Sequence, residues 1–260
     1  MLVLIKYWDA FLVGAVSLLS FYLVSIFSSI YGLLSASVAW AVVAFGLFYN
    51  RYNKEEKITD LKRYIISILF TILGFLGVYL MIEWVSVRWF LAILGSICIG
   101  GVYVASDKLN LSRIAEYKPW RRMFMMLIVF DSFLILASLF GLSVFFNEAL
   151  PFWSLAFTGS VFVACSSLVI WQLYYDKQFK ELLLWVILVA IIIFELMWVV
   201  QFLPFGYLVS GLIITWIWYI LQLFIRFHIS ERGIIWDKQK FFLTGNAVLF
   251  IIFLYFVRWI

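Results

Sequence analysis

Residues Leu182 to Leu203 read LLLWVILVAIIIFELMWVVQFL, an apolar run in which Glu195 is the only ionisable side chain. At about 1.5 Å per residue, a helix of this length extends roughly 33 Å and crosses a hydrocarbon core of about 30 Å. The run therefore predicts a transmembrane helix that carries a carboxyl group within the bilayer.

The rest of the chain has the same apolar character. Of its 260 residues, 67% are hydrophobic and 13% are charged, whereas soluble domains are about half apolar and about a quarter charged. The mean hydropathy is +1.10. No water-soluble fold of this size can bury so much apolar surface, so the composition predicts an integral membrane protein. The many Trp, Tyr and Phe residues (13, 14 and 28) are typical of anchors at membrane interfaces.

Runs of roughly 20 apolar residues predict nine spans in a single integral membrane domain over residues 1–260. The expected fold is an all-α polytopic transmembrane bundle without a soluble domain; an alternative with eight spans requires one weak helix to be dropped. The N-terminal run continues into the first span without a small-residue cleavage motif, so we expect no cleavable signal peptide. The predicted spans are 10–30, 31–49, 64–82, 89–105, 122–146, 152–174, 182–203, 205–225 and 241–257.

The basic residues predict how the chain is threaded through the membrane. If the N-terminus is cytoplasmic, the loops on that side hold all 19 Lys and Arg residues except Arg88 and Arg258. Cytoplasmic loops of membrane proteins retain basic residues. The pattern therefore predicts a cytoplasmic N-terminus and an extracytoplasmic C-terminus, and we expect the protein in a bacterial cytoplasmic (inner) membrane.

Small residues predict where helices approach closely, because helices in lipid associate through small side chains. Ala92, Ser96 and Gly100 recur at four-residue intervals in the fourth span, and comparable stripes occur in the first two spans. These stripes predict a tight N-terminal sub-bundle. The seventh span has Ala190 as its only small residue, so we expect it to approach its neighbours less closely and to lie at the periphery or against bulky partners.

Four polar side chains in or at the ends of the predicted spans form a candidate intramembrane site: Glu195, Asp131, Asn246 and Gln201. An ionised carboxylate at membrane depth costs at least about 2.5 kcal/mol. No Lys or Arg lies at the depth of either acid, because the basic residues are in loops or at helix ends. Three interpretations stay open: a neutral acid that hydrogen-bonds between helices, a proton or cation site, and a contact for a polar or charged membrane partner.

A second candidate site lies at the start of the fifth span, where Lys118, Arg121 and Arg122 surround Trp120. These residues are a candidate contact for an anionic lipid head group or a lipid-linked phosphate. Positive-inside anchoring explains the same residues without a ligand.

The motifs of common catalytic and metal sites are absent from the sequence. His228, the only histidine, follows the eighth span, which leaves no His-based metal site and no Ser–His pair within the membrane. Cys98 and Cys165 lie inside predicted spans and have no spacing that indicates a metal site. We therefore expect no catalytic residues, no cofactor and no bound metal.

Together these features favour a non-enzymatic membrane protein, either a transporter-like module or another membrane component. One alternative is a structural or assembly subunit of a larger membrane complex. A second alternative is a membrane-embedded enzyme that acts on a lipid-linked phosphate substrate. The expected partners are the lipid bilayer and other membrane subunits, and no nucleic acid.

Overall fold

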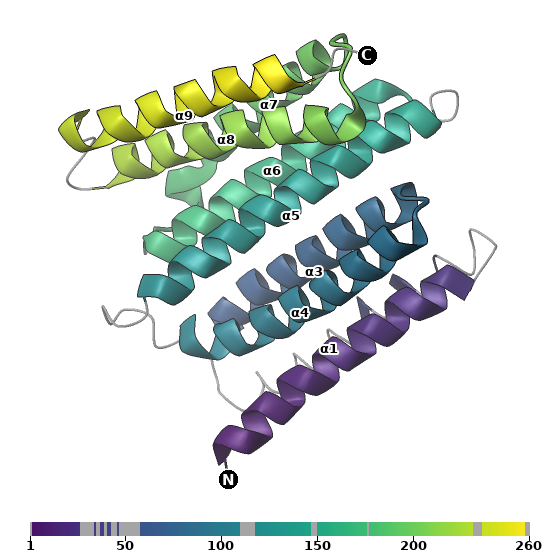
Figure 1. Cartoon of the computed structure of the whole chain (residues 1–260). Coiled ribbons are helices and arrows are strands. Elements are labelled where there is room, and N and C mark those ends of the chain that lie inside the picture. The colour runs from purple at the N-terminus through teal and green to yellow at the C-terminus, as the bar shows by residue number, and fades with distance from the viewer. Residues whose placement is uncertain are drawn as a thin grey trace. The chain divides into compact units, whose positions relative to one another are not determined.

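The structure is a computed structural model (Figure 1) that describes residues 2–26, 58–109, 118–146, 150–175, 177–230 and 236–257, with scattered positions between 34 and 46. Within these residues every regular element is an α-helix. The described helices are α1 (Leu2–Ile26), α3 (Ile58–Met81), α4 (Val85–Leu109), α5 (Lys118–Phe145), α6 (Phe152–Tyr174), α7 (Phe179–Val200), α8 (Tyr207–Ile229) and α9 (Trp236–Phe256).

Six helices in the described residues, α4 to α9, are long and apolar enough to cross a membrane. Two shorter apolar segments, Ala10–Ile26 and Ile66–Met81, belong to α1 and α3. The expectation of an all-helical membrane protein is thereby confirmed at this level. Apart from the scattered positions, the predicted span 31–49 lies outside the described residues.

Prolines stand at the ends of several helices. Pro151 directly precedes α6, whose bounds are those of the predicted sixth span, and Pro204 lies in the turn after α7. Pro119, however, lies within the first turn of α5. A proline is tolerated there because the first N–H groups of a helix have no partner within the helix. As a result α5 begins at Lys118, and the predicted start at residue 122 was too late.

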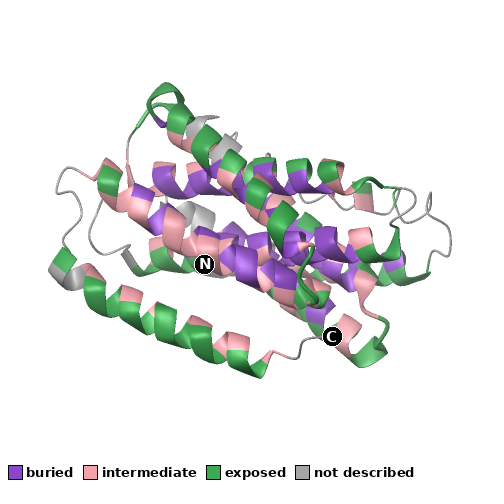
Figure 2. Ribbon diagram, turned by 90° about the horizontal axis from the view of Figure 1, so that it is seen from above, coloured by how far each residue is buried: buried purple, intermediate pink, exposed green. Residues whose placement is uncertain are grey.

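The chain divides into two compact units, Met1–Asp131 and Ser132–Ile260, here called the N-terminal and C-terminal units. The N-terminal unit contains α1, α3, α4 and the first half of α5. The C-terminal unit contains the second half of α5 and α6 to α9. Along most of the described helices, buried positions alternate with exposed ones (Figure 2), because one side of the helix packs against its neighbours. α9 differs, because none of its described residues is buried.

In the N-terminal unit, α1 packs along α4 (Figure 1) through small residues. A methyl group on Gly14 would lie 3.4 Å from the carbonyl oxygen of Ser96, and one on Gly100 would lie 3.3 Å from that of Ala10. The two backbones therefore approach closely at the stripe of small residues on the fourth predicted span, as helices in lipid commonly do.

In the C-terminal unit, α6 supplies the small residue that α7 lacks. A methyl group on Gly159 of α6 would lie 2.7 Å from the sulfur of Met197 on α7. The expectation that α7 approaches its neighbours less closely was therefore wrong for α6, because a glycine on the facing helix leaves room for Met197. The expected peripheral position agrees with the few buried residues of α7. The packed side of α7 is narrow, and its buried residues are Leu182, Val189, Ile193, Met197 and Val200.

The backbones of α5 and α8 also approach closely in the C-terminal unit. A methyl group on Gly211 of α8 would lie 2.7 Å from the backbone nitrogen of Ala137 and 2.8 Å from its Cα. Both distances are far shorter than a van der Waals contact, so a side chain at residue 211 cannot fit without moving backbone. The crossing of α5 and α8 therefore requires glycine at this position.

Candidate functional site

Asp131 lies halfway along α5, roughly 20 Å from the start of the helix. Its side chain is fully buried in the N-terminal unit. Its Oδ2 atom lies 2.6 Å from the hydroxyl oxygen of Thr71 on α3. The other carboxyl oxygen, Oδ1, is buried and has no hydrogen-bond partner among the described residues. Asp131 therefore joins α3 to α5 through a single side-chain contact.

The hydroxyl of Thr71 indicates which group carries the proton. Its oxygen also lies 3.0 Å from the backbone oxygen of Ser67, and a threonine hydroxyl has only one hydrogen to donate. If Thr71 donates to Ser67, a protonated Asp131 donates to Thr71, and both contacts are hydrogen bonds. A charged Asp131 would leave one contact without a hydrogen and would bury an ionised carboxylate inside the protein. The geometry thus favours a neutral acid at Asp131.

Glu195 has the opposite environment, because it is exposed on the surface of α7. It lies about 8 Å before the end of the helix at Val200. At about 100° per residue, it falls in the middle of an exposed arc, roughly opposite the buried stripe. No hydrogen bond or ion pair to Glu195 occurs in the described residues. The arc, here called the outer face of α7, otherwise consists of Leu184, Ile187, Leu188, Ile191, Trp198 and Val199.

Asn246 connects α9 to α8. Its side-chain oxygen accepts a hydrogen bond from Trp216 Nε1 at 3.2 Å, and its side-chain nitrogen donates to the backbone oxygen of Phe242 at 2.8 Å. The ring of Trp216 also contacts Phe250 and Phe253. Asn246 is therefore occupied by a contact between helices.

Gln201 lies directly after α7 and lines a cleft of about 300 Å³ in the C-terminal unit. Its side-chain nitrogen is buried and has no partner among the described residues. The cleft lies where α5 and α7 end and where α6 and α8 begin. It is lined by Phe140, Ser143, Val144, Phe152, Gln201, Leu203, Phe205, Tyr207 and Ser210.

The four residues of the predicted intramembrane site are thus in different environments. Asp131 belongs to the N-terminal unit, and the other three belong to the C-terminal unit. Within the C-terminal unit, none of the hydrogen bonds or ion pairs of the described residues joins Glu195, Asn246 and Gln201 to one another. Each of these three side chains therefore needs its own interpretation.

A row of hydrogen bonds between α6 and α8 was not predicted from the sequence. Trp218 Nε1 donates to Ser167 Oγ at 2.7 Å, Trp171 Nε1 donates to the backbone oxygen of Gln222 at 3.3 Å, and Tyr175 Oη donates to that of Arg226 at 2.8 Å. Each bond joins residues that are 51 positions apart. The constant offset shows that α6 and α8 run parallel, with one hydrogen bond per helical turn.

The side-chain amide of Gln222 is an exception within this row. It is fully buried, and neither its nitrogen nor its oxygen has a partner in the part of the chain that the structure describes. A buried amide without hydrogen bonds is costly in any apolar environment. Gln222 therefore destabilises the interface that its backbone oxygen helps to form.

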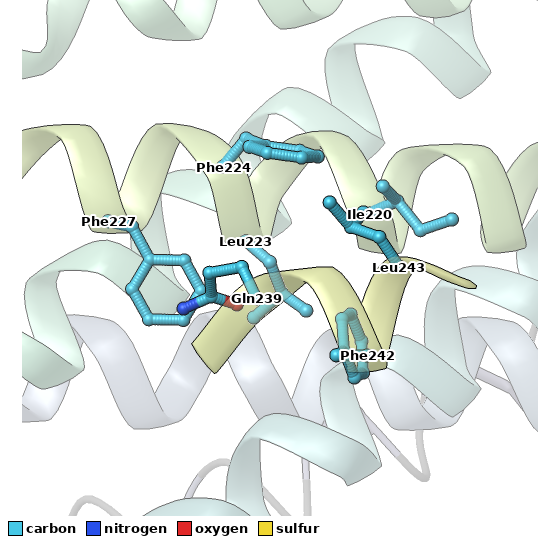
Figure 3. A pocket seen from close by; sticks show the side chains of 7 residues that line it. All are labelled: Ile220, Leu223, Phe224, Phe227, Gln239, Phe242 and Leu243. Carbon is cyan, nitrogen blue, oxygen red and sulfur yellow. The ribbon is translucent and has the colours of Figure 1, made fainter. Parts of the chain in front are cut away.

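A second, much smaller pocket lies between α8 and α9 (Figure 3). Its volume is about 10 Å³, which is close to the minimum for one water molecule. Gln239 contributes the only polar side chain of the lining, so we assign no ligand to it. The other lining residues are Ile220, Leu223, Phe224, Phe227, Phe242 and Leu243.

The basic cluster of the sequence lies in the first turns of α5. Arg122 is exposed and Arg121 is half-buried, while the side chain of Lys118 lies outside the described residues. This placement is consistent both with positive-inside anchoring and with a lipid head-group contact. The role of the cluster stays a prediction.

Comparisons with known proteins assign no family to this chain. No protein-family model matches the sequence, and no curated protein or solved structure shows significant similarity to it. The structure defines the class as an all-helical integral membrane protein, and the geometry of its polar side chains is the basis for inferring a function.

Proposed function

We propose that this chain is a non-enzymatic subunit of a larger membrane complex and that it binds its partner through the outer face of α7. One observation carries the proposal: the only ionisable residue of that face, Glu195, is exposed in the middle of an apolar helix surface. The partner is a transmembrane helix with a Lys or Arg side chain at the depth of Glu195.

The proposal includes a topology of nine spans in a bacterial inner membrane, with a cytoplasmic N-terminus and an extracytoplasmic C-terminus. The concentration of Lys and Arg in alternate loops supports this orientation. In this topology Glu195 lies in the outer half of the bilayer, about 8 Å from the extracytoplasmic end of α7.

In an isolated chain, lipid would surround the exposed side chain of Glu195. Lipid cannot hydrogen-bond a carboxyl group, and intramembrane carboxylates almost always face a protein interior or a watery cavity. A basic side chain on a neighbouring helix would supply both a charge and hydrogen-bond donors. The apolar residues around Glu195 would supply the packing surface.

A second copy of this chain is a less suitable partner. No Lys or Arg lies within the predicted spans at the depth of Glu195. Two copies that met through this face would place two carboxyl groups together without a cation. The charge of Glu195 therefore favours a different protein.

The experiment compares complexes isolated in a mild detergent from the wild-type chain, Glu195→Gln and a matched control, Glu181→Gln. Glu181 is on the same helix, but it is exposed in the first turn and forms an ion pair with Lys177 at 3.2 Å. Native mass spectrometry would report the partner and its stoichiometry.

We expect a stoichiometric partner with a Lys or Arg inside a transmembrane span, retained by wild type and Glu181→Gln. Its retention should fall about tenfold or more in Glu195→Gln, because a hydrogen bond to a charged group contributes about 1.5–3 kcal/mol. Equal retention in all three chains, a dimer of this chain alone, or a partner without such a residue would contradict the proposal.

A transporter-like role is the second candidate, and it rests on Asp131. The buried Oδ1 atom of Asp131 has no partner among the described residues, and intramembrane acids often carry protons or cations in transporters. The test is proton or cation flux in vesicles that contain the purified protein. Asp131→Asn should abolish the flux at normal protein abundance; an unchanged flux would exclude Asp131 as the carrier.

A further inference from the structure

The cleft of about 300 Å³ beside Gln201 contains hydrogen-bond donors that the described residues do not use. Ser210 is only 3% exposed, yet it lines the cleft, and its hydroxyl has no hydrogen-bond partner among the described residues. The hydroxyl of Tyr207 and the side-chain nitrogen of Gln201 also lack partners in this part of the chain. Ser143 differs, because its hydroxyl already donates to the backbone oxygen of Phe140 at 2.7 Å.

Two helices begin at the cleft. α6 begins at Phe152 and α8 begins at Tyr207, and both residues belong to the lining. Neither helix has a side-chain hydrogen bond at its N-cap or an acidic residue in its first turn. The first N–H groups of a helix have no partner within the helix, and the positive end of the helix dipole favours an anion. The cleft is therefore a favourable place for an anionic group that accepts hydrogen bonds.

The lining also limits the size and the polarity of the ligand. It contains no Lys, Arg, Asp, Glu or His side chain, so neutral donors and helix ends must hold the anion. More than half of the lining residues are aromatic or aliphatic, which suits a group that continues into an apolar tail. A phosphate ester with attached glycerol and the first carbons of an acyl chain has this character.

We propose that this cleft binds the phosphate head group of an anionic membrane lipid. The hydroxyls of Ser210 and Tyr207 donate to phosphate oxygens, and the N-termini of α6 and α8 stabilise the negative charge. The apolar lining contacts the glycerol end of the acyl chains. This site is separate from Glu195 and does not depend on a protein partner.

The test measures lipid retention by the purified full chain in a maltoside detergent, which contains no phosphate. Phosphatidylglycerol and a diacylglycerol with the same acyl chains are added separately, and native mass spectrometry reports the bound fraction. The variants are Ser210→Ala and Tyr207→Phe, and Ser143→Ala is the matched control from the same cleft. A further sample receives a large excess of inorganic phosphate over phosphatidylglycerol.

We expect phosphatidylglycerol to bind about tenfold more tightly than diacylglycerol, and each of Ser210→Ala and Tyr207→Phe to weaken its binding by about tenfold. Ser143→Ala should bind like wild type, and inorganic phosphate should not displace the lipid. Equal binding of the two lipids, or equal losses in Ser143→Ala and Ser210→Ala, would overturn the site. Displacement by inorganic phosphate would overturn its assignment to a lipid. Tyr207→Phe keeps the test decisive if Ser210→Ala does not fold.

Discussion

The crossing of α5 and α8 gives the sharpest prediction about stability. In Gly211→Ala, the added methyl group would meet the nitrogen of Ala137 at 2.7 Å, its Cα at 2.8 Å and its Cβ at 3.0 Å. Two of these three atoms are backbone, so the strain cannot be relieved by a change of side-chain rotamer. The helices must separate or shift.

The size of the effect follows from two opposing terms. Overpacking a well-packed site costs about 1–3 kcal/mol, whereas replacing glycine by alanine within a helix gains about 1 kcal/mol. Gly245→Ala on α9 isolates the second term, because Gly245 is exposed and its added methyl group would have nothing within 4 Å. The difference between the two variants should therefore be about 1–3 kcal/mol, with Gly211→Ala the less stable.

The free energy of unfolding of both variants can be measured in detergent micelles by denaturant titration, with wild type as the reference. Gly245→Ala should unfold like wild type or at slightly higher denaturant concentration, and Gly211→Ala at a lower one. If the two variants are equally stable, α5 and α8 do not cross at Ala137 as described, and the reasoning fails.

Three further substitutions test single polar contacts. Thr71→Val removes the only hydrogen-bond partner of Asp131 in the described residues and should lower the free energy of unfolding by about 1–3 kcal/mol. Thr71→Ser keeps the hydroxyl and should not lower it. Equal losses in the two variants would show that the hydroxyl is not the cause. Gln222→Leu replaces a buried amide without partners by an apolar side chain and should raise the free energy of unfolding; a loss of stability would mean that the amide has a partner. Tyr175→Phe loses the 2.8 Å bond to the backbone oxygen of Arg226 and should cost about 1 kcal/mol at pH 8. Burial raises the pKa of Tyr175 above 10.0, so the fold favours the neutral phenol. The contribution of this phenol to the free energy of unfolding should be complete below pH 10.0 and disappear as the pH rises through the raised pKa. If thermal unfolding shows a Tyr175→Phe stability loss that does not change with pH, this prediction is refuted.

The sequence was sufficient to predict α4 to α9 as helices that can cross a bilayer, because length and hydropathy decide whether a segment can do so. The apolar run around Glu195 and the span that became α6 illustrate this. The stripe of Ala92, Ser96 and Gly100 also indicated a close helix contact, since small residues at four-residue intervals leave room for a neighbouring backbone. Neither pattern identifies the neighbour, so the pairing of α1 with α4 required the structure.

The sequence also could not predict whether the side chains of Glu195 and Asp131 are buried or exposed. α7 is apolar on all sides, so its sequence does not indicate which side packs against the protein and which faces lipid. The buried residues of α7, among them Met197 against Gly159, place Glu195 on the exposed side. Asp131 is instead buried in the N-terminal unit, where its side chain contacts Thr71 of α3.

The row of hydrogen bonds between α6 and α8 corresponds in the sequence only to a four-residue spacing, which does not by itself predict a contact. Ser167, Trp171 and Tyr175 are four residues apart, as are Trp218 and Gln222. Such spacing indicates one face of a helix, but the two faces become a pair only when the offset of 51 positions is known.

Photo-crosslinking in living cells tests the central claim most directly. A benzoylphenylalanine at Ile191, one turn before Glu195 on the outer face of α7, would be compared in the wild-type and Glu195→Gln backgrounds. The same probe at Phe157, an exposed position on α6, is the control. We predict that the probe at Ile191 crosslinks to one other protein, on a transmembrane helix that contains a Lys or Arg residue. Glu195→Gln should remove most of this product. The probe at Phe157 should not form it. A product formed equally in both backgrounds, or crosslinking to lipid alone, would contradict a role for Glu195 in assembly.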